Sequence, residues 1–595
     1  MPVNNRGFWL GFAVLALILG LGYWLWLSPV VGAADVRVHV RSAWVYYDGL
    51  VDGLDYPDWD ATAYGGRGNP APRFIGAAPL LFASFLQIFG IAALAAVKIV
   101  VAMFALLGLA GVYFWLVSIG SATAFPWAAL FFMVHPLVSF HLGVAFLFQN
   151  LCAYFLSPWL WCAAVAVWRG DRRAYMFGGL AMGFIAWSHL YFAFMVGCAW
   201  VLLMLVSWLK TRQRRFLTAT FLVPVLAMMF SAPYLLPAML TSGDVYYEEV
   251  SKVLRPGRPG CEFIDEPVVN DKNQVLSWWQ ALQELTRSPE EGLPAHLRNT
   301  GQVTSILQMK SSENRLKALR PWLLLCLMLC FILACVGSLR RDIVDKESPV
   351  PLWIWLFVGS CCAFMSLRFA FVIYSVLPGA MAVQFPFRWL LPAFGLWIPL
   401  IAAGVMPANV AITSGFRGQF MAWFSRFFLV IFLLLGVLLQ SLFWVLPDDS
   451  MKSFFAAPGH LAPFYPRAVP KTRDVPAVAG VPHLIDIASG SGVITGYQAG
   501  VAWFEARGEA QTPIELHINT HYDPGWRFTN LRTGSVKPRV DEKDGTMLLH
   551  IPAGSWFLTM ERASPRGRSI GWLLMLVSLF IMAFSARQGS RHEDC

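Results

Sequence analysis

Carboxylates, a histidine and arginines gather directly after the first apolar run of the chain. Asp35 and His39 are spaced i and i+4, so they share one face if this stretch is helical. A carboxylate there can act as a general base on a hydroxyl group, and an arginine can neutralise a phosphate leaving group. The neighbouring residues with suitable side chains are Arg41, Asp58, Trp59, Asp60 and Arg67.

The same stretch has a purely structural interpretation, which stays open. A solvated loop would have this composition, because aspartates cap helices and glycines form turns. The glycine-rich run at 64–70 lacks the lysine of a phosphate-binding loop, which excludes a nucleotide-binding loop. Asp58 and Asp60 suit an acceptor or a divalent cation, but two carboxylates do not define a metal site. We therefore predict no metal ligand and no certain cofactor, with a divalent cation as the open option.

The composition requires lipid around the helices that position these residues. Of the 595 residues 57% are hydrophobic and 13% are charged, and the mean hydropathy is +0.57, which one soluble core cannot accommodate. Apolar runs of spanning length predict about twelve transmembrane helices in a polytopic α-helical membrane protein. They lie near 8–28, 94–118, 125–142, 150–168, 174–191, 192–209, 216–238, 320–339, 352–372, 388–406, 427–446 and 569–587.

Charge sets the predicted orientation. The basic tracts at 169–173, 210–215 and 340–341 fall on one side of the membrane, so the positive-inside rule places both termini in the cytoplasm. These short tracts account for the net charge of +10 without a nucleic-acid partner. The small residues at 31–34 leave signal-peptide cleavage as an alternative to a retained first span.

The predicted organisation alternates membrane and outer segments. The short apolar run at 79–90 predicts an interfacial or re-entrant helix. Alternating residues at 514–518 and 547–551, separated by turn signals, predict an extracytoplasmic β domain near the C-terminus. Its Trp503, Trp526 and Trp556 suit either sugar stacking or core packing. The segments are a first span (1–28), a first outer loop (29–93), an N-terminal helical bundle (94–238), a second outer loop (239–319), a C-terminal helical bundle (320–446), the β domain (447–568), and a last span with a cytoplasmic tail (569–595).

The order of several motifs resembles a known family. Together they are similar to pyruvoyl-tetrahydropterin-synthase-related membrane proteins and their YfhO-like relatives, which look like GT-C glycosyltransferases. The motifs are Asp35-x-x-x-His39, Tyr56-Pro57-x-Trp59, Gly65-Gly66-x-Gly68-x-Pro70, Ser188-His189-Leu190, Gln384-Phe385-Pro386-Phe387-Arg388-Trp389-Leu390 and Tyr522-x-Pro524-Gly525-Trp526.

This resemblance implies an enzyme of the bacterial inner membrane. It would take a sugar from a polyprenyl-phosphate carrier and pass it to an envelope glycan or lipid acceptor on the outer side. Asp35 would be the general base with His39 assisting, and Arg388 would stabilise the carrier phosphate, with lesser contributions from Arg41 or Arg67. The remaining candidate substrate-binding residues are Asp58, Trp59, Asp60, His189 and Gln384.

Departures from the family pattern keep other functions open. Ala145 and Asn150 stand where the family has an arginine-glycine and a glutamate, so a charge pair is missing. A non-catalytic scaffold or a transport component of envelope biogenesis is therefore the alternative. For Arg388 the structural alternative is an interfacial anchor, and for His189 it is a helix-packing residue.

Overall fold

The computed structural model describes much of the helical bundle and most of the β domain. The described residues are 36–61, 63, 67–135, 137–138, 147–245, 321, 323–338, 349–377, 386–405, 423–427, 429–431 and 485–590. The predicted span at 8–28, most of the one at 427–446 and most of the loop at 239–319 lie outside them.

Long apolar helices form the bundle. Four described stretches are long and apolar enough to cross a bilayer, and two bent helix pairs raise the number to six. Shorter apolar helices include α6 (Phe125–Val134) and α22 (Arg568–Ser590), and α9 (Arg173–Ser188) has 16 residues. The structure thus supports a polytopic helical bundle, while full-length spans are fewer than twelve among the described residues. The four stretches are α5 (Ala93–Ser118), α8 (Phe148–Arg169), α10 (Leu190–Thr211) and Pro386–Gly404, which joins η8 (Pro386–Trp389) to α19 (Leu390–Val405).

Two of the predicted spans are bent in the structure. Helices α11 (Arg214–Phe230) and α12 (Ala232–Leu240) meet at 80°. Pro233 lies in the first turn of α12, where its ring and missing N–H prevent α11 from continuing. Helix α17 (Leu352–Phe364) is followed at 87° by Arg368–Val376, which contains α18 (Phe371–Val376). The predicted spans at 216–238 and 352–372 therefore correspond to broken helices, each of which can count as one span.

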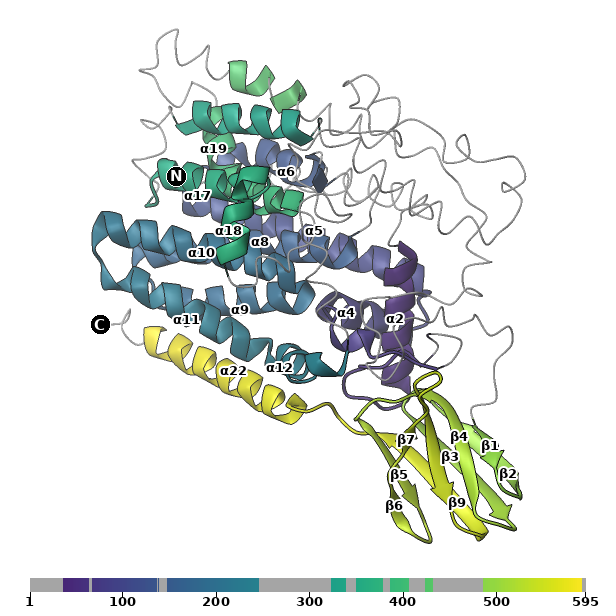
Figure 1. The fold of residues 1–595 in the computed structure, drawn as a ribbon. Coiled ribbons are helices and arrows are strands. Elements are labelled where there is room, and N and C mark those ends of the chain that lie inside the picture. The colour runs from purple at the N-terminus through teal and green to yellow at the C-terminus, as the bar shows by residue number, and fades with distance from the viewer. Residues whose placement is uncertain are drawn as a thin grey trace, which may run out of the picture.

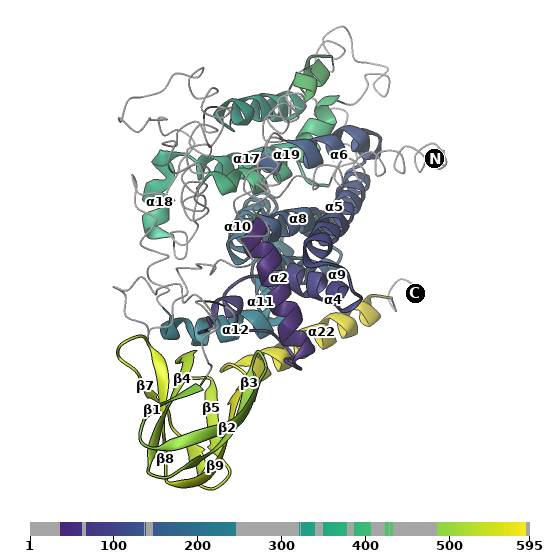
Figure 2. The ribbon, with the colours of Figure 1, turned by 90° about the vertical axis from the view of Figure 1, so that its right-hand side faces the viewer.

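Two short helices lie at one end of the bundle. Helix α2 (Val36–Val51) runs across the ends of the long helices, beside the predicted short helix, which is α4 (Ala78–Ile88) (Figures 1 and 2). Ser84 Oγ and Gln87 Nε2 of α4 both donate to the carbonyl of Ala43, at 3.0 and 2.9 Å. These buried hydrogen bonds fix α2 against the bundle.

The C-terminal domain is a sandwich of two antiparallel sheets at the same end of the bundle as α2 (Figures 1 and 2). The predicted alternating segments are β4 and β8, paired with Ile514 opposite Ile551 and Leu516 opposite Leu549. Their apolar side chains face the other sheet across one buried core. The sheet orders are β1 (Ile485–Ser489), β4 (Ile514–His521), β8 (Thr546–Ile551), β7 (Arg539–Val540), and β2 (Gly492–Ala499), β3 (Trp503–Ala510), β9 (Gly554–Arg562), β5 (Trp526–Asn530), β6 (Gly534–Val536).

One core residue of this domain comes from the opposite end of the chain. Trp59 is 1% exposed and packs among the side chains of the sandwich core. Its ring meets Trp526 edge to face with centroids 5.4 Å apart, and the guanidinium carbon of Arg562 lies 4.3 Å from its centroid. The segment after α2 is therefore part of the β domain's packing.

Beside Trp59 lies a buried four-charge cluster, defined as Asp58, Arg73, Asp523 and Arg562. Arg73 Nη2 donates to Asp58 Oδ2 and Asp523 Oδ2, both at 3.2 Å. Arg562 donates to Asp58 Oδ1 at 3.1 Å and to Asp523 Oδ1 at 3.3 Å. None of the four side chains is more than 3% exposed. Two positive and two negative charges thus compensate one another between the first segment and the β domain.

The chain then returns from the β domain to the bundle along α22. Arg568, at the start of that helix, stacks on the Tyr56 ring with 4.0 Å between its guanidinium carbon and the centroid. It also donates to the Tyr56 carbonyl at 3.3 Å. Helix α22 packs against α11 and α12, as Figure 1 shows. The C-terminal end of the β domain is therefore held to the first segment twice, at the four-charge cluster and at the contact between Arg568 and Tyr56.

Replacing Arg562 by Met should destabilise the docked β domain. Removing one partner of a buried charge group leaves a carboxylate uncompensated, which costs about 3–5 kcal/mol. Arg539→Met is the matched control, since Arg539 is 72% exposed in its pair with Glu515 and should contribute less than about 1 kcal/mol. Thermal unfolding of the detergent-solubilised chain compares them. Equal midpoints for the two variants would contradict a structural role for the cluster.

Candidate functional site

His39 lies on α2 against the first turn of α8. Its half-buried imidazole meets the Phe148 ring edge to face with centroids 5.7 Å apart. Burial lowers the pKa of His39 to about 4, so the ring is neutral at pH 7. A neutral imidazole can accept a proton or orient a hydroxyl group. Its predicted partner Asp35 lies outside the described residues.

His189 separates α9 from α10. Its backbone is extended, with φ −158° and ψ 107°, and its Nδ1 accepts the backbone N–H of Phe192 at 3.0 Å. The imidazole therefore caps α10, as a Ser or Asp side chain does in other helices. This capping role fits the structural interpretation of His189, and it also fixes the ring at the helix break.

A close backbone contact joins the helix break to α8. A Cβ atom at Gly76 would overlap the carbonyl oxygen of Ser188, so only glycine permits this approach. Gln149 of α8 donates from Nε2 to the Gly76 carbonyl at 2.6 Å. The segment before α4, the end of α9 and the start of α8 therefore meet at one place, between His39 and His189.

Arg388 lies at the same end of the bundle. It is 7% exposed within η8, and the adjacent Trp389 packs against Phe194 of α10 with ring centroids 6.3 Å apart. A cation buried at the mouth of a span is costly without an anionic or polar neighbour. The preceding Gln384 lies outside the described residues.

Asn150, which departs from the family pattern, is buried close to Gln149 at the start of α8. It is 1% exposed in the first turn of α8, and neither amide atom makes a hydrogen bond within the described structure. The neighbouring Gln149, by contrast, is bonded to Gly76. An unpaired buried amide costs free energy unless a ligand or water supplies the missing hydrogen bonds. We group His39, Asn150, His189 and Arg388 as the bundle-end site.

The other predicted substrate-binding residues contact protein groups instead. Asp58 and Trp59 are at most 2% exposed, because they dock the β domain. Asp60 pairs with Arg41 at 3.1 Å. Arg67 pairs with Asp544 at 3.1 Å and donates to Asn519 at 3.1 Å. The structure therefore gives Asp58, Trp59 and Arg67 a docking role and does not bring them to the bundle-end site.

Two further sequence interpretations change with the structure. Trp526 and Trp556 are 6% and 4% exposed, so core packing accounts for both. Asp58 and Asp60 face arginines and do not form a cation-binding pair. Among the described residues, ligand-type atoms converge elsewhere, at His517, Asp541 and Asp544 of the β domain.

Residues 73–278 match the family model described as the 6-pyruvoyl-tetrahydropterin synthase related domain, a membrane protein. The apolar helices and this match define a helical membrane protein with a C-terminal β domain. The match confirms the family resemblance over that range, which is less than half of the chain and includes Asn150 and His189.

No curated protein matches the chain. The solved structures that match include the crystal structure of ArnT from Cupriavidus metallidurans bound to undecaprenyl phosphate. The identity is 13%, and the alignment covers 67% of this chain and 77% of ArnT, with a TM-score of 0.30. At that TM-score the likeness has no weight for the fold or the function of this chain.

The four-charge cluster should resist mild acid. Burial alone would raise the pKa of Asp58, but the guanidinium groups of Arg562 and Arg73 outweigh it and hold the pKa below its usual value. Asp523 shows the same balance. A carboxyl with a lowered folded-state pKa stabilises the fold above its unfolded pKa of about 3.9 and loses this contribution as pH falls further.

Protease resistance of the β-domain junction should therefore persist from pH 7 to about pH 4 and decline below it. Limited proteolysis across this range, with an acid-tolerant protease, measures the change. Asp58→Asn should weaken the junction at pH 7 and flatten its acid dependence. Loss of resistance between pH 7 and 5 in the wild-type chain would show that these carboxyl groups are not held ionised.

Asn150→Leu should leave stability unchanged or raise it by up to about 1–3 kcal/mol, because it removes an unpaired buried amide. Gln149→Leu is the matched control on the same helix turn. It should destabilise the chain, since the Gly76 carbonyl loses its donor. Thermal unfolding in one detergent compares the two. An equal loss in both variants would show that the Asn150 amide has a structural partner.

Proposed function

We propose that the chain is a GT-C-type glycosyltransferase. It moves a sugar from a polyprenyl-phosphate carrier to an extracytoplasmic cell-envelope acceptor. The observation that carries the proposal is that His39, Asn150, His189 and Arg388 lie on elements at the same end of the helical bundle. The motif resemblance supports it, since the family-model match includes the residues between Gly76 and His189.

The proposed roles follow from the chemistry of each side chain. Arg388 offers a permanent positive charge to the carrier phosphate as the phosphate leaves. Asp35 accepts the proton of the acceptor hydroxyl, and the neutral His39 orients that hydroxyl. The Asn150 amide offers a donor and an acceptor together, which suits a sugar hydroxyl better than a phosphate that only accepts.

The proposal places the chain in the bacterial inner membrane with both termini in the cytoplasm. It is supported by the positions of the basic tracts at 169–173 and 210–215, which lie at the bundle ends opposite α2. In this orientation α2, the bundle-end site and the β domain face the periplasm. A carrier with its sugar exposed on that side reaches the site by lateral movement in the membrane.

A non-catalytic scaffold of envelope biogenesis is the second candidate. The uncharged Asn150 favours it, because no carboxylate stands at this position to act as a base. In this alternative the docked β domain is the functional unit, and the bundle serves to anchor it.

Mass spectrometry of envelope glycans and polyprenyl-phosphate sugars separates the two. Asp35→Asn should reduce transfer by a factor of about 10²–10⁴, as removal of a general base does, and the carrier-linked sugar should accumulate. Arg388→Met should give the same pattern. Wild type, deletion and the exposed Arg539→Met variant, at equal protein level, are the controls. Normal glycans in both site variants, with an envelope defect in the deletion alone, would favour the scaffold.

A further inference from the structure

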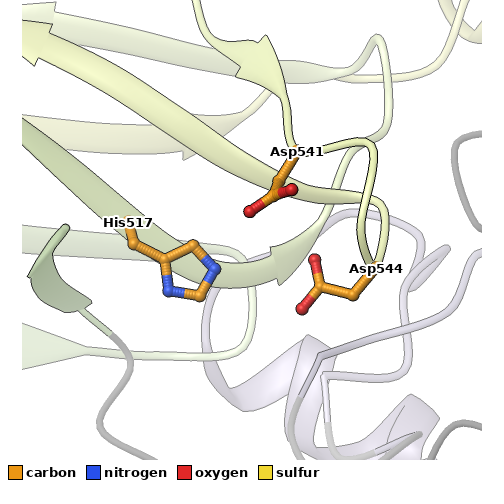
Figure 3. Close-up of side chains that lie close together, drawn as sticks. All are labelled: His517, Asp541 and Asp544. Carbon is orange, nitrogen blue, oxygen red and sulfur yellow. The ribbon is translucent and has the colours of Figure 1, made fainter.

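Three potential metal ligands converge on one edge of the β domain. His517 lies on β4, Asp541 follows β7, and Asp544 lies in the turn before β8. Their ligand atoms all lie within 4.8 Å of one another, and each side chain is half-buried. Figure 3 shows the imidazole and the two carboxylates pointing toward a common space. We call these three residues the β-edge triad.

We propose that the β-edge triad binds one divalent first-row transition-metal ion. One imidazole nitrogen with two carboxylates is a donor set that suits Mn²⁺ or Zn²⁺. Ca²⁺ and Mg²⁺ prefer oxygen ligands throughout, so they fit less well. Two negative carboxylates neutralise the charge of the ion, and the partial exposure of the triad leaves room for water to complete the coordination.

Neighbouring groups hold the ligands in place. Thr546 donates to Asp544 Oδ1 from its backbone N–H at 3.1 Å and from its hydroxyl at 2.5 Å. Because that hydroxyl has one hydrogen, it accepts from His517 Nε2, which lies 2.7 Å away. Asp541 Oδ1 accepts the Lys543 N–H at 2.9 Å. The contacts on the two carboxylates orient them as outer contacts orient metal ligands, whereas an ion at His517 Nε2 would displace the hydrogen that this nitrogen donates to Thr546.

The triad adjoins a contact with the first segment of the chain. Arg67 Nη2 lies 3.1 Å from Asp544 Oδ2, so the arginine already places a positive charge on one ligand. The backbone N–H of His521 also donates to the Arg67 carbonyl at 2.7 Å. An ion at Asp544 would compete with the Arg67 guanidinium. Metal binding therefore weakens the Arg67–Asp544 pair, and it does so independently of any transferase activity.

Calorimetric titration of the full-length chain tests this proposal. The protein is purified in detergent without a histidine tag, treated with EDTA, and titrated separately with Mn²⁺ and Zn²⁺. One saturable site per chain is expected. His517→Ala and the nearly isosteric Asp541→Asn should each lower the affinity by at least about tenfold. His550→Ala, at an exposed histidine on β8 outside the triad, is the matched control and should bind as wild type does.

Arg67→Met separates a metal site from a hydrogen-bonded turn. Without the competing guanidinium the affinity for the ion should rise by several-fold, whereas a purely structural cluster would gain nothing. Thermal unfolding without metal checks that each variant is folded. The proposal is overturned if the wild-type chain shows no saturable site, if Asp541→Asn binds as tightly as wild type, or if Arg67→Met leaves the affinity unchanged.

Discussion

The buried four-charge cluster is the constraint on which the arrangement of the extramembrane segments depends. Removing two carboxylates and two guanidinium groups from water is costly, and the cost is offset only when the charges meet in good geometry. All four carboxylate oxygens of Asp58 and Asp523 accept from Arg73 or Arg562. The segment after α2 and the β domain must therefore dock in one orientation, because a displaced domain would leave buried charges unpaired.

This docking fixes what lies between the β domain and the bundle. Trp59 fills the sandwich core, and Tyr46 of α2 donates to the Pro72 carbonyl at 2.7 Å, next to the clustered Arg73. Helix α2 is thus held from below by the β domain and from the side by α4. His39 lies on this helix, so its position against Phe148 follows from the same contacts. The four-charge cluster, which lies outside the bundle-end site, thereby contributes to the position of His39.

Local pattern predicted the elements but not their pairing. The alternation at 514–518 and 547–551 correctly predicts β4 and β8, since a half-buried strand repeats every two residues. Local sequence does not distinguish Asp58 from a catalytic aspartate, because one of its two arginine partners, Arg562, lies about 500 residues away in the chain. The boundary between the predicted spans 174–191 and 192–209 falls two residues from the helix break at His189, whereas the break at Ser231 was not predicted. Hydropathy measures length and apolarity, while prolines and side-chain caps decide where a helix ends.

Buried polar side chains differ in whether the fold supplies their hydrogen-bond partners. A buried polar side chain is stable in the fold when its partners are present, as for Asp58, Arg562 and Gln149. The Asn150 amide is equally buried yet makes no hydrogen bond within the described structure, and this imbalance has a free-energy cost that packing does not remove. The uncharged Asn150 cannot act as a base, but it still offers a hydrogen-bond donor and an acceptor to a ligand. In a transferase the charged roles would belong to Asp35 and Arg388. The Asn150 amide would then contact a neutral part of the substrate, such as a hydroxyl group, that both donates and accepts hydrogen bonds.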